Sequence, residues 1–194
     1  MLKTMRFLVL LSLFLPVQLA ALADAETAAP SASPVDSQAE VRREVASAQG
    51  FSLVPPEGWV AYVPADESFM AFRAPAGVGG AGRFSPFFRI RVDPDLSDQG
   101  IGIDELGPFL KLTFDKLLPK WELDGEGFET LSGQKSYFIS VRQDPVRCGC
   151  HDLQYYVPAS RHRLFTLTFS VLLEEYAQYE PVFRQVARSI RLID

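Results

Sequence analysis

The feature that most limits how this chain can fold is a strict alternation of large apolar and small polar side chains. It is clearest in residues 163–171, RLFTLTFSV, where large apolar residues alternate with threonine and serine. Successive side chains of a β-strand point to opposite faces, so this segment predicts a strand with one buried face. Residues 84–92 repeat the pattern, with Phe88, Ile90 and Val92 on one side and Phe87, Arg89 and Arg91 on the other.

Other segments have the composition of strands and lie close to these two along the chain. The stronger candidates are residues 69–73, 137–142 and 153–157, and the weaker ones are 51–54, 59–63 and 121–128. Residues 158–162 connect two of these segments in the manner of a short hairpin. Short links between successive strands imply a largely antiparallel sheet.

Two segments have helical periodicity. In the first, apolar residues recur every three or four positions from Ile103 to Leu117, and Pro119 ends the helix. In the second, Pro181 suits a first helical turn. An apolar stripe then follows it, made of Val182, Phe183, Val186 and Ile190.

Each predicted helix has a single apolar side and should therefore cover one face of the sheet. The fold class is α+β, with an antiparallel β-sheet packed between helices. Helices on opposite faces make an α/β/α sandwich, and helices on one face make a two-layer fold. In a three-layer sandwich, we expect the helix on the other face of the sheet to cover the side that carries Phe87, Arg89 and Arg91. An uncovered face of this composition would suit a protein interface.

Residues 1–23 have the pattern of a secretory signal peptide. Lys3 and Arg6 precede the apolar run FLVLLSLFL, and Ala21-Leu22-Ala23 matches the small-x-small cleavage pattern. A retained anchor is disfavoured because the uncharged stretch is shorter than the roughly 20 residues of a spanning helix. No later segment is apolar enough to span. We therefore expect export to the periplasm or the extracellular space, with no stable membrane span after cleavage.

The rest of the chain divides into a linker and one domain. Residues 24–49 are expected to be a flexible linker with a short helix at 38–49, because their composition offers little apolar surface to bury. Residues 50–194 are expected to form a single globular domain. The formal net charge of −5 and the pI near 5.1 argue against nucleic acid as a partner, since phosphate backbones require a basic surface.

The string Cys148-Gly149-Cys150-His151 allows three interpretations. The first and favoured one is a local disulfide, which would rigidify one turn and stabilise the fold by only about 1.6 kcal/mol. The second is a soft-metal site with Cys148, Cys150 and His151 as ligands, which lacks the fourth ligand of a closed zinc site. The third is a redox-active dithiol. His162 lies at the far end of the following strand, too distant to complete a metal site.

Other chemical motifs are weak. The glycine-rich segment 76–82 joins two strand-like runs and is followed by no lysine, so it predicts a hairpin loop rather than a phosphate cradle. No Gly-x-Ser-x-Gly elbow occurs, and only His151 and His162 are available to assist a nucleophile. No spacing isolates a carboxylate pair. We therefore predict no catalytic residues and no cofactor.

Residues 50–194 resemble the PsbP-like fold family, which includes bacterial secreted domains of the DcrB type and an import factor that binds the GTPase Ran. The resemblance rests on GFSLVPPEGW at residues 50–59, on LFTLTFS at 164–170, and on the closing segments 179–183 and 186–191. It implies an antiparallel sheet between helices, used as a docking module. The Cys-Gly-Cys string and the long linker are not part of the family pattern, and no metal-associated residue of PsbP is matched here.

The sequence therefore predicts an exported, non-catalytic domain that serves as a protein-binding or assembly module of the cell envelope. Its expected partner is an envelope or extracellular protein. The alternative is a thiol- or soft-metal-handling protein that uses Cys148, Cys150 and His151.

Overall fold

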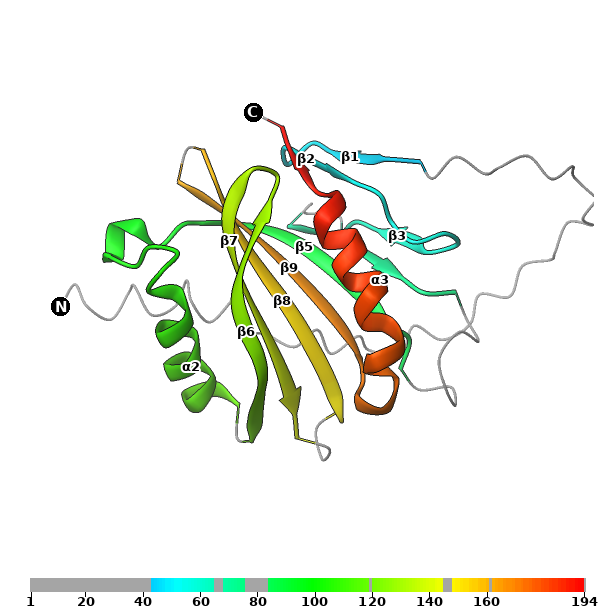
Figure 1. The fold of residues 1–194 in the computed structure, drawn as a ribbon. Helices are drawn as coiled ribbons and strands as arrows, with labels where there is room; N and C mark the ends of the chain where they lie inside the picture. Colours follow the sequence, from blue (N-terminus) through cyan, green and yellow to red (C-terminus); the bar gives the residue numbers. More distant parts are fainter. Residues whose placement is uncertain are drawn as a thin grey trace, which may run out of the picture. The chain divides into compact units, whose positions relative to one another are not determined.

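An antiparallel sheet of seven strands forms the centre of the fold, in the order β3-β4-β5-β9-β8-β7-β6 (Figure 1). A smaller sheet has the order β1-β2-β10. The strands are β1 Val45–Ser47, β2 Phe51–Leu53, β3 Val60–Tyr62, β4 Phe69–Arg73, β5 Phe87–Pro94, β6 Trp121–Leu131, β7 Gln134–Gln143, β8 Cys150–Ala159, β9 Arg163–Leu172 and β10 Arg191–Leu192. The helices are α2 Leu106–Leu117 and α3 Tyr176–Ser189, with short 3-10 turns η2 Ser97–Gln99 and η3 Leu173–Glu175.

The computed structural model describes residues 43–64, 68–75, 84–118, 120–144, 148–160 and 162–193. These residues belong to one compact unit, Val41–Asp194. The predicted signal peptide, residues 24–42 of the predicted linker, the glycine-rich segment 76–82 and Pro119 lie outside the described residues. In the described part, neither helix has the length and apolar character needed to cross a membrane.

The alternating pattern is confirmed as the source of the large sheet. Strands occur at all the predicted positions, and β9 includes the whole of the clearest segment. Every neighbouring pair in the large sheet runs antiparallel. The fold is therefore α+β, as the sequence predicts.

The N-terminal edge of the domain differs from the prediction. Residues 45–47 form strand β1, whereas the sequence predicts a helix over 38–49. Val45 pairs with Leu53 and packs against the core, so burial favours an extended conformation here. The turn closes at Gly50, whose φ of +90° few other residues adopt, and the Gly50 amide donates to the Ser47 carbonyl at 3.1 Å.

Helix α3 begins earlier than the sequence predicts. It starts at Tyr176, so Pro181 lies inside the helix rather than in its first turn. A proline at this position cannot donate to the carbonyl four residues before it. The apolar stripe extends back through Tyr179 to Tyr176, and burial of both rings outweighs the lost hydrogen bond.

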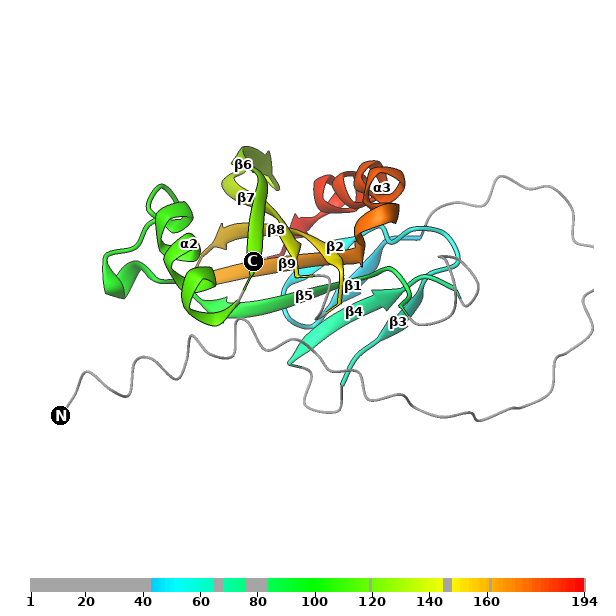
Figure 2. The ribbon, with the colours of Figure 1, turned by 90° about the horizontal axis from the view of Figure 1, so that it is seen from below.

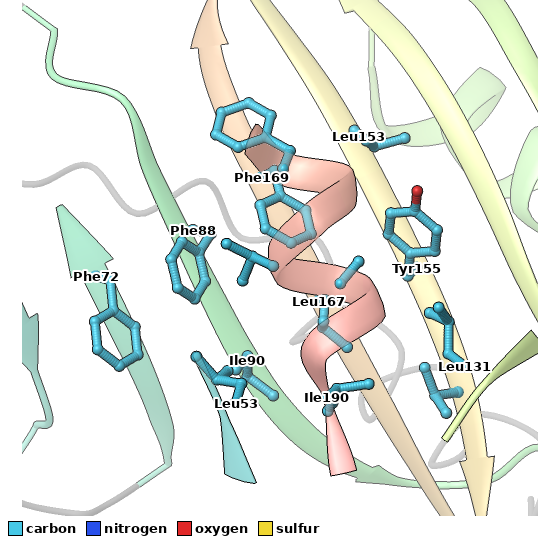
Figure 3. Close-up of a cluster of buried hydrophobic side chains, with 14 of the residues drawn as sticks. Leu53, Phe72, Phe88, Ile90, Leu131, Leu153, Tyr155, Leu167, Phe169 and Ile190 are labelled. Carbon is cyan, nitrogen blue, oxygen red and sulfur yellow. The ribbon is translucent and has the colours of Figure 1, made fainter. Parts of the chain in front are cut away.

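The hydrophobic core lies between α3 and one face of the large sheet (Figures 2 and 3). Phe183 of α3 is fully buried and packs on Phe169 of β9, with ring centroids 5.0 Å apart. Figure 3 shows the surrounding side chains from β4, β5, β8 and β9, and from the smaller sheet. They include Leu53, Phe72, Phe88, Ile90, Leu153, Tyr155 and Leu167.

Helix α2 packs against β6 and β7. It meets Tyr137, which is adjacent in β7 to the core residue Phe138 and therefore points to the other face of the sheet. Helix α2 does not cover Phe87, Arg89 and Arg91, so this prediction is wrong. These residues belong to β5, and β9 and β8 lie between β5 and the strands on which α2 packs. The reason lies in Ile139 and Val141 of β7, which provide the buried apolar surface on α2's side.

One packing contact gives a prediction in which two effects oppose each other. A Cβ added at Gly107 in α2 would lie 2.8 Å from the Tyr137 hydroxyl oxygen. Alanine favours a helix over glycine by about 1 kcal/mol, whereas overpacking costs roughly 1–3 kcal/mol. We expect Gly107→Ala to lower the free energy of unfolding in urea denaturation. The same change in a Tyr137→Phe background removes the clashing oxygen and should be less destabilising.

Candidate functional site

A groove of about 900 Å³ lies at one end of the large sheet, where β6 begins, β7 ends, β8 begins and α3 begins. We call it the His151 groove. Its lining residues are Lys120, Trp121, Glu122, Asp124, Arg142, Gln143, Asp144, His151, Leu173, Glu174, Tyr176 and Ala177. Its size falls within the range of ligand-binding sites, and its lining mixes aromatic rings with charged groups.

His151 forms part of the wall of the groove. It is the second residue of β8, pairs with Arg142 of β7 and Val171 of β9, and is only 3% exposed. Its imidazole stacks on the ring of Tyr176, with centroids 3.4 Å apart and planes inclined by 7°. Sheet pairing and stacking therefore fix the imidazole in one orientation.

A buried hydroxyl connects these two rings. Ser140 Oγ lies 2.7 Å from His151 Nε2 and 3.1 Å from the Tyr176 hydroxyl oxygen. Burial lowers the pKa of His151, and Asp124 only partly opposes this effect. The imidazole is therefore neutral near neutral pH. Burial also raises the pKa of Tyr176, so its hydroxyl stays protonated.

The rim of the groove is charged and mostly paired. Arg142 lies 3.4 Å from Glu122 and 3.5 Å from Asp124, and Lys120 lies 4.0 Å from Asp144. With Glu174 on the α3 side, the lining has four carboxylates and two basic side chains. The excess of carboxylates favours a positively charged ligand group.

A β-bulge positions Asp124. The pairing of β6 with β7 shifts between Leu123 and Gly125, which leaves Asp124 as the extra residue. A bulge bends the strand and redirects a side chain. Here the Asp124 carboxylate reaches within 3.6 Å of His151 Nε2.

The geometry does not match a serine-nucleophile site. In a catalytic triad, serine and aspartate contact opposite nitrogens of the imidazole. Here both Ser140 and Asp124 approach Nε2. Ser140 is also only 3% exposed and does not line the groove. The arrangement is suited to binding through fixed rings and charges.

The lowered pKa of His151 gives a pH prediction. In the unfolded chain His151 takes up a proton near its ordinary pKa of 6.5, and in the folded chain it does so only at lower pH. The unfolded state therefore binds more protons in this window, and stability falls as the pH is lowered through it. We expect His151→Gln to lose less stability than the unsubstituted chain between about pH 7 and pH 5. Urea denaturation of both chains at several pH values across this window measures the difference. Equal slopes of the unfolding free energy against pH would contradict the prediction.

The other predicted site residues lie beside the groove or far from it. The sulfur atoms of Cys148 and Cys150 lie within disulfide-bonding reach, with Cα atoms 5.2 Å apart. In the described residues, no group of three histidine, cysteine or acidic side chains is arranged to hold a metal ion. His162 is at the other end of β8 with its side chain 77% exposed, 3.2 Å from Ser97 Oγ.

The sequence patterns did not identify the residues that surround His151. Ser140 lies in an ordinary strand pattern, and nothing local marks it. Asp124 precedes the first of two glycines in β6, and glycine within a strand often marks a bulge, so this signal was available. Tyr176 continues the apolar stripe of α3, and its helical spacing from Tyr179 and Phe183 was a usable signal.

Comparisons with known proteins give the fold a name. No family model matches the chain, and no curated protein matches it in sequence. Among solved structures, the chain is similar to cyanobacterial PsbP from Synechocystis sp. PCC 6803, with a TM-score of 0.56 and 18% identity. That match covers 82% of this chain and 99% of the other. The chain therefore has a PsbP-like fold, as the resemblance implied.

Two further structures are similar. LpqN of Mycobacterium tuberculosis, described as involved in cell envelope biogenesis, matches with a TM-score of 0.56 and 14% identity over 78% of this chain and 90% of the other. PA94 of Pseudomonas aeruginosa, a protein of unknown function and putative regulator, matches with a TM-score of 0.54 and 15% identity over 76% and 94%. At these identities the likeness concerns the fold.

Proposed function

We propose that this chain is an exported accessory module of the cell envelope that binds a partner protein through the His151 groove. The single observation that carries the proposal is the groove itself, in which a fixed pair of rings is surrounded by charged side chains without nucleophile geometry. Its PsbP-like fold is shared with a protein described as involved in cell envelope biogenesis.

The arrangement of layers supports this use of the fold. We infer an α/β/α sandwich, because α2 meets Tyr137 on one face of β7 and α3 packs on the other. In this arrangement the helices stabilise the sheet, and the strand ends are left to form a binding site. The groove takes its residues from these ends and from the start of α3.

The charge of the groove indicates the kind of partner. Four carboxylates and two basic groups line it, and the chain as a whole carries a net charge of −5. We infer a partner segment that carries lysine or arginine, with Trp121 in the lining to contact its aliphatic or aromatic parts. A nucleic acid would be repelled by the same carboxylates.

Site-specific photo-cross-linking in the native envelope tests the proposal. A photoreactive residue at Ala177, which is exposed and lines the groove, should give one discrete adduct. The same residue at Leu112 is the control, because this side chain is 61% exposed and belongs to α2. An adduct that forms equally from both positions, or from neither, would count against the groove as the binding surface.

A further inference from the structure

The backbone around the two cysteines is held independently of their sulfur atoms. The amides of Cys148 and Gly149 both donate to the Asp144 carbonyl at 3.3 Å, and the Leu173 amide donates to the Gly149 carbonyl at 2.9 Å. Gly149 has a φ of +58°, a conformation that favours glycine. Cys150 is the first residue of β8 and pairs with Leu172.

A bond between the two sulfur atoms would add little to this framework. It closes a loop of only three residues, and such a short loop restricts the unfolded chain weakly. The surrounding hydrogen bonds and sheet pairing already fix the backbone on both sides. The domain can therefore keep the same fold with the pair oxidised or reduced.

The two sulfur atoms differ in access. Cys150 is buried, with 2% of its surface exposed, whereas Cys148 is partly exposed. An incoming thiol would therefore meet Cys148 first, and Cys150 would be the sulfur displaced. Access is one of the factors that decide which sulfur of a disulfide is attacked, so this asymmetry favours attack at Cys148.

Polar groups next to Cys148 can accommodate the reduced state. Its Sγ lies 3.9 Å from the Gln143 side-chain carbonyl oxygen, which can accept a hydrogen bond from a thiol. The Gln143 amide donates to the buried Asp152 carboxyl, which also accepts from Ser170 Oγ at 2.6 Å. Asp152 and Ser170 therefore hold Gln143 in place beside the sulfur.

We propose that Cys148 and Cys150 form a reversible disulfide that exchanges with the dithiol of a partner protein. One partner thiolate attacks Cys148 Sγ, a mixed disulfide forms, and the Cys150 thiolate leaves and takes up a proton. The partner's second thiolate then attacks the partner sulfur that is bonded to Cys148, the partner disulfide forms, and the Cys148 thiolate leaves and is protonated. The partner dithiol is oxidised to a disulfide, and the Cys148–Cys150 pair is reduced to two thiols.

Equilibration of the folded chain with glutathione tests the reversibility. We expect the pair to be partly reduced in buffers with about 10 mM reduced glutathione and a small fraction of oxidised glutathione, measured by mass after thiol alkylation. Circular dichroism should show the fold unchanged. A pair that stays oxidised until the chain unfolds, or that oxidised glutathione never oxidises, would overturn the proposal.

Two single-cysteine variants test the order of attack. In Cys150→Ser, Cys148 should form a mixed disulfide with oxidised glutathione at least about tenfold faster than Cys150 does in Cys148→Ser. The rates should become equal in denaturant, because the difference comes from burial. Equal rates in the folded variants would overturn the assignment. This proposal does not depend on the groove as a binding surface, since glutathione is the probe.

Discussion

Replacing Phe183 by alanine is expected to lower the free energy of unfolding by about 3–5 kcal/mol. Phe183 is fully buried between α3 and the sheet. Its ring centroid lies 5.0 Å from that of Phe169, 5.9 Å from Tyr179 and 6.5 Å from Trp59. The truncation would remove these contacts and leave a cavity that three neighbouring rings cannot easily fill. Urea denaturation followed by tryptophan fluorescence measures the loss.

Leu112→Ala is the matched control for this prediction. Leu112 is also a large apolar residue of a helix, but 61% of it is exposed. We expect a change within about 0.5 kcal/mol. If Phe183→Ala were as mild as the control, α3 would not be the element that closes the core.

The second large effect is expected at Arg184, the residue that ties α3 to the edge of the sheet. Its guanidinium donates to Glu180 at 2.9 Å, to Glu129 at 2.8 Å and to the Tyr155 hydroxyl at 3.1 Å. It also lies over the Phe138 ring, 5.1 Å from the centroid. Arg184→Ala would remove one donor that three partly buried groups share, and we expect a loss of about 2–3 kcal/mol.

Arg188→Ala is the control for Arg184, because it lies one turn later on α3 and contacts the same Glu129. Its Nε is 3.5 Å from that carboxylate, and its side chain is 62% exposed, against 23% for Arg184. Exposed ion pairs contribute less than about 1 kcal/mol. Thermal and urea denaturation of both variants should separate them clearly, and equal losses would contradict the assigned role of Arg184.

The large sheet was predictable because its signal is local. Each strand buries one face, so the alternation in residues 163–171 is sufficient to identify β9 without knowledge of its neighbours. The helical stripe from Ile103 to Leu117 identified α2 in the same way, although the helix itself starts at Leu106. The predictions are wrong at the positions where packing against distant parts of the chain determines the local structure. Val45 is extended because it packs on the core, and Pro181 is tolerated because the rings of Tyr176 and Tyr179 are buried.

The candidate site was only partly predictable because four elements contribute to it. The sequence singled out His151, but its partners are distant along the chain. Ser140 and Tyr176 contact it from β7 and α3, and Asp124 reaches it only through the bulge in β6. The cysteines, by contrast, are adjacent in sequence, so the string itself indicated their proximity.

The most direct test that the His151 groove binds the partner is a calorimetric titration. The partner identified by cross-linking is purified and titrated against two charge-reversal variants. Glu174→Lys places a positive charge at the groove, and Glu57→Lys makes the same change at an exposed position outside its lining. We predict that Glu174→Lys weakens the affinity at least about tenfold, while Glu57→Lys changes it less than about twofold. Equal affinities for the two variants would show that the partner binds elsewhere.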